Sequence, residues 1–188
     1  MSLARRLMFS VVLPLGIPLV ALAAGQPPSS PAHDAQHAPP GTLIDKVQNA
    51  TRRFRDINVA KAEYWMAGTP CVSGPDTGAM GVHFFKQGKA LDGELNVDEP
   101  EALIYEPLGH NLFRLVAVEY IVIAADWAAK HKDGPPVLEG NLMNFVDAPN
   151  RYGLGAFYEL HVWAWENNPK GSFADWNTQV NCERQPGD

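Results

Sequence analysis

Between Thr42 and Gly68 the chain carries the hydrophobic pattern of an amphipathic helix. Apolar side chains recur at helical spacing at Val47, Ala50, Phe54, Ile57 and Tyr64. Basic side chains occupy positions that face away from this stripe, as expected for a helix that packs one face against a core. Thr42, with Asp45 three residues later, resembles a capping box, and Gly68 and Pro70 end the pattern. We therefore predict one long helix at the start of the domain.

Four later segments are rich in Val, Ile, Phe, Tyr and Trp, the residues favoured in strands. They span residues 81–86, 102–106, 113–124 and 157–166. Gly and Asp cluster between the first two segments, and a turn with Pro and Gly joins the next two. Such short links fit hairpins, since parallel strands need longer crossovers. The predicted fold class is α+β, with the long N-terminal helix packed on a curved antiparallel sheet that is open or barrel-like.

A long irregular stretch, residues 126–156, interrupts the strand pattern. Residues 126–132 favour a short helix, and the remainder is punctuated by Gly and Pro. Long irregular loops in folded domains often serve as lids or binding loops. Leu142, Met143 and Phe145 are the apolar residues that would close over a cavity as a lid, or that would pack onto the rim of the sheet. Both arrangements are consistent with the sequence.

Residues 1–23 have the features of a secretory signal peptide. Arg5 and Arg6 precede an apolar run over residues 7–22, and Ala21 and Ala23 fit the small-residue cleavage site. The run is shorter than the roughly 20 apolar residues of a membrane span. No cysteine follows the cleavage point directly, which argues against a lipid anchor. We expect cleavage near Ala23 and a periplasmic or secreted protein without a stable membrane anchor.

Residues 24–41 are rich in Pro, Ser, Gln, Ala and Gly, a composition that does not bury enough apolar surface to fold. We predict a disordered linker there. One α+β domain then follows over residues 42–188, a length that suits a single hydrophobic core.

The chain is acidic, with 15 Lys and Arg against 21 Asp and Glu and a formal net charge of −6. Loss of Arg5 and Arg6 with the signal peptide makes the net charge of the mature chain −8. Without a basic stripe, such a chain is a poor partner for nucleic acid or an anionic membrane. We expect a small molecule or a metal ion as the bound partner.

Cys71 and Cys182 are the only two cysteines. In an oxidising compartment a lone pair most simply forms a disulfide, worth about 4–5 kcal/mol in the chain-entropy model for a loop of this length. The alternative is a metal site with two thiolate ligands. We predict the disulfide, which also removes a free thiol that could act as a nucleophile.

Residues 158–165 carry the strongest chemical signal in the chain. Side chains alternate between the two faces of a strand, so Glu159, His161, Trp163 and Trp165 share one face. A carboxylate, an imidazole and two indoles together are unusual for plain core packing. The pattern indicates a polar or metal-bearing site walled by aromatic residues.

His83 and Glu119 lie in the middle of two other predicted strands, where a charged group is costly to bury without a partner. If their faces coincide with that of Glu159 and His161, two imidazoles and one or two carboxylates converge. Imidazole nitrogen and carboxylate oxygen suit Zn, Mn, Fe or Cu. We therefore predict a divalent metal site here, with Tyr105 as a hydrogen-bond donor behind the ligands.

The same residues have structural explanations that the sequence leaves open. Each histidine, taken alone, is typical of a hydrogen-bonded structural residue, and Glu119 would be satisfied by Arg114 or Arg151. Trp163 and Trp165 would then fill the space between sheet and helix.

The sequence is consistent with three kinds of function. The first is an exported metal-binding protein, or a metal-dependent enzyme, that uses His83, Glu119 and His161 with Glu159 nearby. The second is a non-catalytic periplasmic binding module for a small apolar or sugar-like ligand in an aromatic-walled cavity. The walls of that cavity would be formed by Phe85, Tyr105, Trp163 and Trp165. The third is a metal-free enzyme that pairs Glu119 or Glu159 with His161 for acid–base chemistry.

Several short motifs together resemble a known protein family. They are Gly-Ala-Met-Gly-Val-His at 78–83, Pro-Glu-Ala-Leu-Ile-Tyr-Glu-Pro at 100–107, Val-Glu-Tyr at 118–120, Leu-His-Val-Trp-Ala-Trp at 160–165 and Asn-Pro-Lys-Gly at 168–171, with Trp176, Asn177 and Cys182. In these motifs the chain is similar to a family of small exported bacterial proteins of unknown function. The resemblance covers nearly all of the mature domain and implies an exported single-domain protein, but it implies no catalytic residues.

Overall fold

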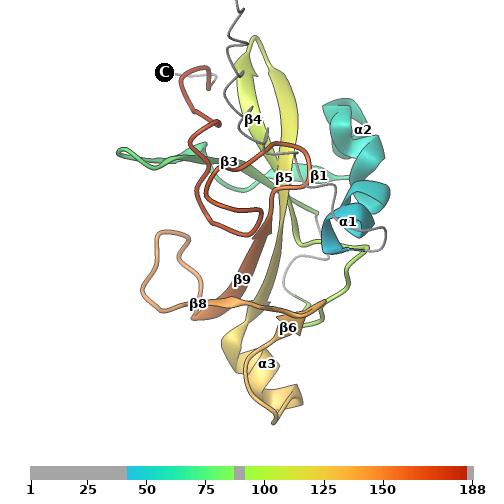
Figure 1. Ribbon diagram of the computed structural model, residues 1–188, viewed down its shortest axis with the longest axis vertical. Helices are drawn as coiled ribbons and strands as arrows, with labels where there is room; N and C mark the ends of the chain where they lie inside the picture. The colour runs from blue at the N-terminus through green and yellow to red at the C-terminus, as the bar shows by residue number, and fades with distance from the viewer. Residues whose placement is uncertain (1–41, 87–91, 186–188) are drawn as a thin grey trace, which may run out of the picture. The chain divides into compact units, whose positions relative to one another are not determined.

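The computed structural model describes residues 42–86 and 92–185, and their fold is shown in Figure 1. All of these residues belong to one unit of the chain, Ala38–Asp188. The predicted signal peptide (1–23) and linker (24–41) lie outside the described residues. Within the part of the chain that the structure describes, no helix is long and apolar enough to cross a membrane.

An antiparallel sheet forms the centre of the fold. Its long strands are β3 (Gly78–Lys86), β4 (Ala102–Gly109), β5 (Leu112–Ile123) and β9 (Phe157–Val162). Shorter strands flank or extend them: β1 (Trp65–Ala67), β2 (Val72–Gly74) and β8 (Asn144–Val146). The order is β1-β3-β4-β5-β9-β8, and β2 pairs with β3. The antiparallel α+β arrangement is confirmed, and the sheet is open rather than barrel-like because the terminal strands β1 and β8 do not pair with each other.

Short elements follow the end of β5. Helix α3 (Ala124–Lys130) begins directly after the strand, in the region where the sequence predicted a short helix over 126–132. Strands β6 (Val137–Leu138) and β7 (Asn141–Leu142) then form a small separate hairpin. With β8, the stretch that looked irregular in sequence therefore carries short regular elements as far as Val146.

The predicted long N-terminal helix is wrong. The segment forms three short elements: α1 (Leu43–Thr51), a 3-10 turn η1 (Arg52–Arg55) and α2 (Ile57–Ala62). At the end of α1, the Thr51 hydroxyl donates to the Val47 carbonyl oxygen at 2.6 Å. Asp56 then adopts an extended conformation, and its carboxylate accepts from the Asn58 backbone N–H at 2.9 Å to cap α2. Side-chain bonds to the backbone compete with a continuous helix, and here they divide it.

The sheet separates two apolar clusters. Val47 and Phe54 of the N-terminal elements pack on one face together with Tyr105. Val180 of the C-terminal segment packs with Ile104 on the opposite face. Figure 1 shows α1 and α2 on one side of the sheet and the C-terminal segment, coloured red, on the other. The candidate site lies on the face covered by the C-terminal segment.

Two kinds of bond hold the C-terminal segment to the sheet. The predicted disulfide between Cys71 and Cys182 is present, with a sequence separation of 111 residues. Ala79 and Asn177 also exchange backbone hydrogen bonds, each with an N–O distance of 3.1 Å. These bonds place the segment where it can cover the functional face.

Gly78 allows the close approach of these two backbones. Its φ is +84°, and a Cβ atom there would lie 2.1 Å from the Asn177 carbonyl oxygen. We expect Gly78→Ala to lower the free energy of unfolding by about 2–4 kcal/mol, because the costs of a left-handed conformation and of overpacking add. Urea unfolding measures this loss.

Gly140→Ala is the matched control for this prediction. Gly140 has a nearly identical φ of +82° but open space around it, so only the conformational cost of about 1–2 kcal/mol applies. Equal losses of stability in the two variants would contradict the backbone contact at Gly78.

Candidate metal centre

Strand pairing brings the four predicted polar residues to one face of the sheet. Glu119 on β5 pairs directly with His161 on β9, and Ile121 pairs with Glu159 two positions along. His83 on β3 reaches the same face across β4. The two-residue period of strands predicted the shared face of Glu159 and His161, and the strand pairing meets the condition that the faces of His83 and Glu119 coincide with it.

Three of these residues converge on one point. The distance from His83 Nε2 to Glu119 Oε2 is 3.4 Å, and the distance from His161 Nε2 to Glu119 Oε1 is 3.9 Å. One ligand atom from each residue lies within 4.8 Å of the other two. The relative exposure of His83, Glu119 and His161 is only 1%, 2% and 0%. This is the arrangement that a bound cation requires of its ligands.

Burial determines the protonation states of the cluster. Loss of solvent lowers the pKa of His83 to about 4 and that of His161 to about 3, so both imidazoles are neutral at pH 7. Burial raises the pKa of Glu119 well above its usual value, and the nearby Glu159 charge raises it further. Burial is also the main cause of the raised pKa of Glu159. Neutral imidazoles are the form that binds metal ions.

Several buried polar atoms of this cluster lack a hydrogen-bond partner among the described residues. They are His83 Nε2, both ring nitrogens of His161, and Glu159 Oε2. A buried polar group left without a partner costs about 1–3 kcal/mol. Clustering of such groups is a sign that they serve a ligand rather than the fold.

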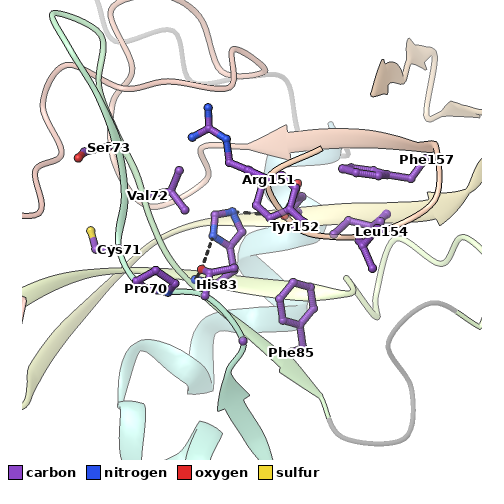
Figure 2. A pocket seen from close by; sticks show the side chains of 14 residues that line it. Pro70, Cys71, Val72, Ser73, His83, Phe85, Arg151, Tyr152, Leu154 and Phe157 are labelled. Atoms are coloured by element: carbon purple, nitrogen blue, oxygen red, sulfur yellow. Dashed lines mark hydrogen bonds and ion pairs between the residues drawn. The ribbon is translucent and has the colours of Figure 1, made fainter. Parts of the chain in front are cut away.

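The opposite side of the His83 ring is held in place. Its Nδ1 lies 3.3 Å from Thr69 Oγ1, and the same oxygen accepts from the His83 backbone N–H at 3.2 Å. The dashed lines at His83 in Figure 2 mark its side-chain interactions. Anchoring of one ring nitrogen directs the other, as is typical of metal-bound histidines.

Arginine does not neutralise Glu119. Arg114 pairs with Glu106 at 2.6 Å and also with Glu166. Arg151 makes no ion pair with Glu119 among the residues that the structure describes. The structural explanation based on a buried Glu–Arg pair is therefore contradicted.

Asp175 is a member of the site that sequence reasoning missed. Its Oδ1 lies 3.8 Å from His161 Nδ1 and accepts from Asn144 Nδ2 at 3.2 Å. Asp175, His161 and Glu159 form a second group whose ligand atoms lie within 4.8 Å of one another. Asp175 belongs to the C-terminal segment outside any strand, so no periodic pattern could have indicated it.

The predicted aromatic wall is only half correct. The ring of Trp163 stacks with that of His161 at a centroid distance of 6.4 Å, and Phe85 stacks with His83 at the same distance. Tyr105 and Trp165 lie with the cluster on the opposite face.

Tyr105 and Trp165 are bound to the N-terminal elements. The Tyr105 hydroxyl donates to the Phe54 carbonyl oxygen at 2.6 Å, and Trp165 Nε1 donates to Thr51 Oγ1 at 3.0 Å. The prediction for Trp165 failed because β9 ends at Val162 and the alternation of faces ends with it. Tyr105 therefore does not act behind the metal ligands.

A pocket of about 560 Å³ opens onto His83 and Glu119. Part of its wall comes from residues 126–156, the stretch for which a lid and packing on the sheet rim were both left open, through Arg151, Tyr152 and Leu154 (Figure 2). The residues proposed for closing it are not among the lining residues: Met143 lies in the core on the helix side, and Leu142 and Phe145 are exposed. The loop contributes to the pocket, but with different residues from those predicted.

No protein-family model, curated protein or solved structure matches this chain. The resemblance of its motifs to a family of exported proteins stays a prediction. The function must therefore be inferred from the geometry of the site.

The metal-free site should lose stability as pH rises. A carboxyl group whose pKa is raised in the folded state stabilises the fold below its unfolded pKa, and this contribution disappears as pH rises through the folded value. Glu119 and Glu159 both behave in this way. The two histidines, whose pKa values are lowered, change stability only below pH 6.5, so they do not contribute between pH 7 and pH 9. Burial raises the pKa of Glu101 to about 8, so Glu101 also titrates in this range, and comparison with a variant that keeps Glu101 separates the contribution of the site.

We expect Glu119→Gln to reduce this loss of stability, because the variant removes one of two neighbouring buried carboxyl groups. With chelator present at pH 9, the variant should exceed the wild type in free energy of unfolding by at least about 1 kcal/mol, the equivalent of one pKa unit. Glu106→Gln, which removes a carboxylate paired with Arg114, should change stability in the opposite direction. A less stable Glu119→Gln variant at pH 9 would contradict the assignment.

Proposed function

We propose that this protein is an exported metal-binding protein in which His83, Glu119 and His161 hold one divalent ion. The observation that carries this proposal is the convergence of three buried ligand atoms without a compensating cation. Both histidines are neutral at pH 7. Glu119, whose pKa is raised by burial, would release its proton when the ion binds, and the resulting carboxylate would balance part of the charge of the ion.

The spacing of the ligand atoms supports an ion of the size of zinc. Two ligands at about 2.1 Å from a tetrahedral ion are about 3.4 Å apart. The His83–Glu119 distance of 3.4 Å has this value, and the His161–Glu119 distance of 3.9 Å is slightly wider. Two imidazoles and one carboxylate also suit Fe, Mn and Cu.

An ion at this position would retain an open coordination site. Three protein ligands leave at least one position for water or a substrate, as in catalytic metal sites. The pocket reaches His83 and Glu119, so a small molecule could approach the ion from that side. This geometry favours metal-dependent chemistry over a purely structural ion. We therefore extend the proposal from a metal-binding protein to a metal-dependent enzyme.

The disulfide supports export as part of the proposal. Disulfides persist in oxidising compartments and are rare in the cytosol, and the Cys71–Cys182 bond is compatible with the periplasm or the cell exterior.

A binding module without catalysis is the second candidate. It is favoured by the volume of the pocket, about 560 Å³, which lies within the range of roughly 300–1,000 Å³ seen for small-molecule sites. Of the four aromatic residues proposed for the cavity wall, Phe85 lines the pocket, and Tyr105, Trp163 and Trp165 are not among its lining residues; Tyr152 and Phe157 line it as well.

Metal content tests the proposal directly. Residues 24–188, purified without a His-tag and dialysed against chelator, would be titrated with Zn²⁺, Mn²⁺, Fe²⁺ and Cu²⁺ in a calorimeter, and elemental analysis would follow. We expect near one ion per chain, with affinity lowered at least about 100-fold in His83→Ala and His161→Ala, because each removes a ligand.

His110→Asn is the matched control for the two histidine variants. His110 is exposed in the turn between β4 and β5 and has a φ of 50°, which asparagine tolerates. Its metal uptake should equal that of the wild type. Absence of uptake by the wild type, or equal loss in all three variants, would overturn the proposal.

Asp175 should tune metal affinity through His161. Its carboxylate lies within reach of the His161 nitrogen that does not face Glu119, and such partners are worth about 10- to 100-fold in metal affinity. We expect Asp175→Asn to lower affinity by that factor while the stoichiometry stays at one ion. Asp76→Asn, at an exposed turn, is the control, and a fall in melting temperature without a fall in affinity would contradict the role.

A further inference from the structure

The walls of the pocket are predominantly apolar. Its aliphatic lining residues are Pro70, Val72, Ile121 and Leu154. Its aromatic lining residues are Phe85, Tyr152 and Phe157. In Figure 2 the His83 ring lies among these side chains, with Val72 on one side and Leu154 on the other. Such walls bind the hydrocarbon part of a ligand.

Arg151 is the only cationic side chain of lysine or arginine among the residues that line the pocket. Its guanidinium carbon lies 5.4 Å from the ring centroid of Trp176. No ion pair to Arg151 exists within residues 42–86 and 92–185. Figure 2 shows its guanidinium directed away from the His83 ring. The pocket thus has a guanidinium without an ion-pair partner among the described residues, although its charge is near enough to Glu159 to offset part of the rise that burial causes in the pKa of that carboxyl group, and it also opens onto His83 and Glu119.

Three hydroxyl groups line the pocket, on Thr69, Ser73 and Tyr152, and two of them already have a partner in the protein. Thr69 Oγ1 bonds to His83, and the Tyr152 hydroxyl donates to Met80 Sδ at 3.5 Å. A sugar needs many free donors and acceptors from its site, and this wall provides few. A guanidinium, by contrast, matches a carboxylate with two parallel hydrogen bonds.

We propose that the pocket binds a small monocarboxylate with an aromatic or branched aliphatic body. The carboxylate pairs with Arg151, and the body lies against Val72, Leu154 and Phe157. The opposite end of the molecule then points toward His83 and Glu119. Only the chemistry at that end rests on the proposed metal function; the binding itself does not.

Binding of two matched probes to the metal-free protein tests this assignment. The probes are 3-phenylpropanoate and 3-phenylpropanamide, which have the same body but differ in charge. We expect the wild type to bind the carboxylate at least tenfold more tightly by calorimetry, since a hydrogen bond to a charged group is worth about that much or more. The preference should disappear in Arg151→Gln.

Arg55→Gln is the control for the arginine variant. Arg55 is also exposed and also lies over an indole, with its guanidinium carbon 5.1 Å from the Trp165 ring centroid, but it does not line the pocket. The carboxylate preference should persist in this variant. A wild type without the preference, or a preference that survives Arg151→Gln, would overturn the assignment.

Repetition with zinc present separates this inference from the metal proposal. A carboxylate preference that appears only with zinc and ignores Arg151 would mean that the ion binds the carboxylate, which overturns the role of Arg151 and leaves the metal proposal intact. A preference in a protein that takes up none of Zn²⁺, Mn²⁺, Fe²⁺ and Cu²⁺ would support the pocket assignment and overturn the metal proposal.

Leu154→Asp tests the apolar wall. Leu154 lines the pocket, whereas Leu142 is an exposed leucine on β7. We expect Leu154→Asp to weaken the binding of both probes at least fivefold. Leu142→Asp should leave the affinity for both probes unchanged. Equal binding by the two variants would contradict the position of the hydrocarbon body.

Discussion

Glu119 is buried without a lysine or arginine partner among the residues that the structure describes. This is the constraint on which the rest of the site depends. The neighbours of Glu119 are two neutral histidines and a second carboxyl group, Glu159. A buried carboxyl group costs little only if it is protonated, paired or bound to a metal. The arginines that could neutralise it bind elsewhere or point away. The raised pKa of Glu119 and the proposed binding of a metal ion both follow from the burial of this carboxyl group without a basic partner among the described residues.

One face of the sheet carries an apolar core that stabilises the fold, and the other face carries the candidate metal site. Helices α1 and α2 cover one face with an apolar core that includes Tyr105 and Trp165 as partners. The other face is covered by a segment with little regular structure, tied down by the Cys71–Cys182 disulfide and the Ala79–Asn177 backbone bonds. That segment supplies Asp175. Because few regular elements cover this face, it has room for both a pocket and polar side chains.

Strand periodicity was sufficient to group two of the main polar residues. Glu159 and His161 were assigned to one face of their strand because alternation holds as long as a strand is regular, whereas it was left open whether the faces of His83 and Glu119 coincide with it. The same rule failed for Trp165, three residues beyond the end of β9. Helical periodicity failed in a similar way, since Thr51 and Asp56 bond to the backbone and divide the predicted helix. Patterns report which face is apolar, but they do not report where an element ends.

The sequence by itself determined the α+β class, the disulfide and the shared face of Glu159 and His161, because these depend on composition and on periodicities of a few residues. Only the tertiary structure decided which strands are neighbours, and hence that Glu119 lies opposite His161. It also decided that Asp175 and Arg151 join the site. Both come from irregular segments, whose positions are set by long-range packing and a covalent bond rather than by local pattern.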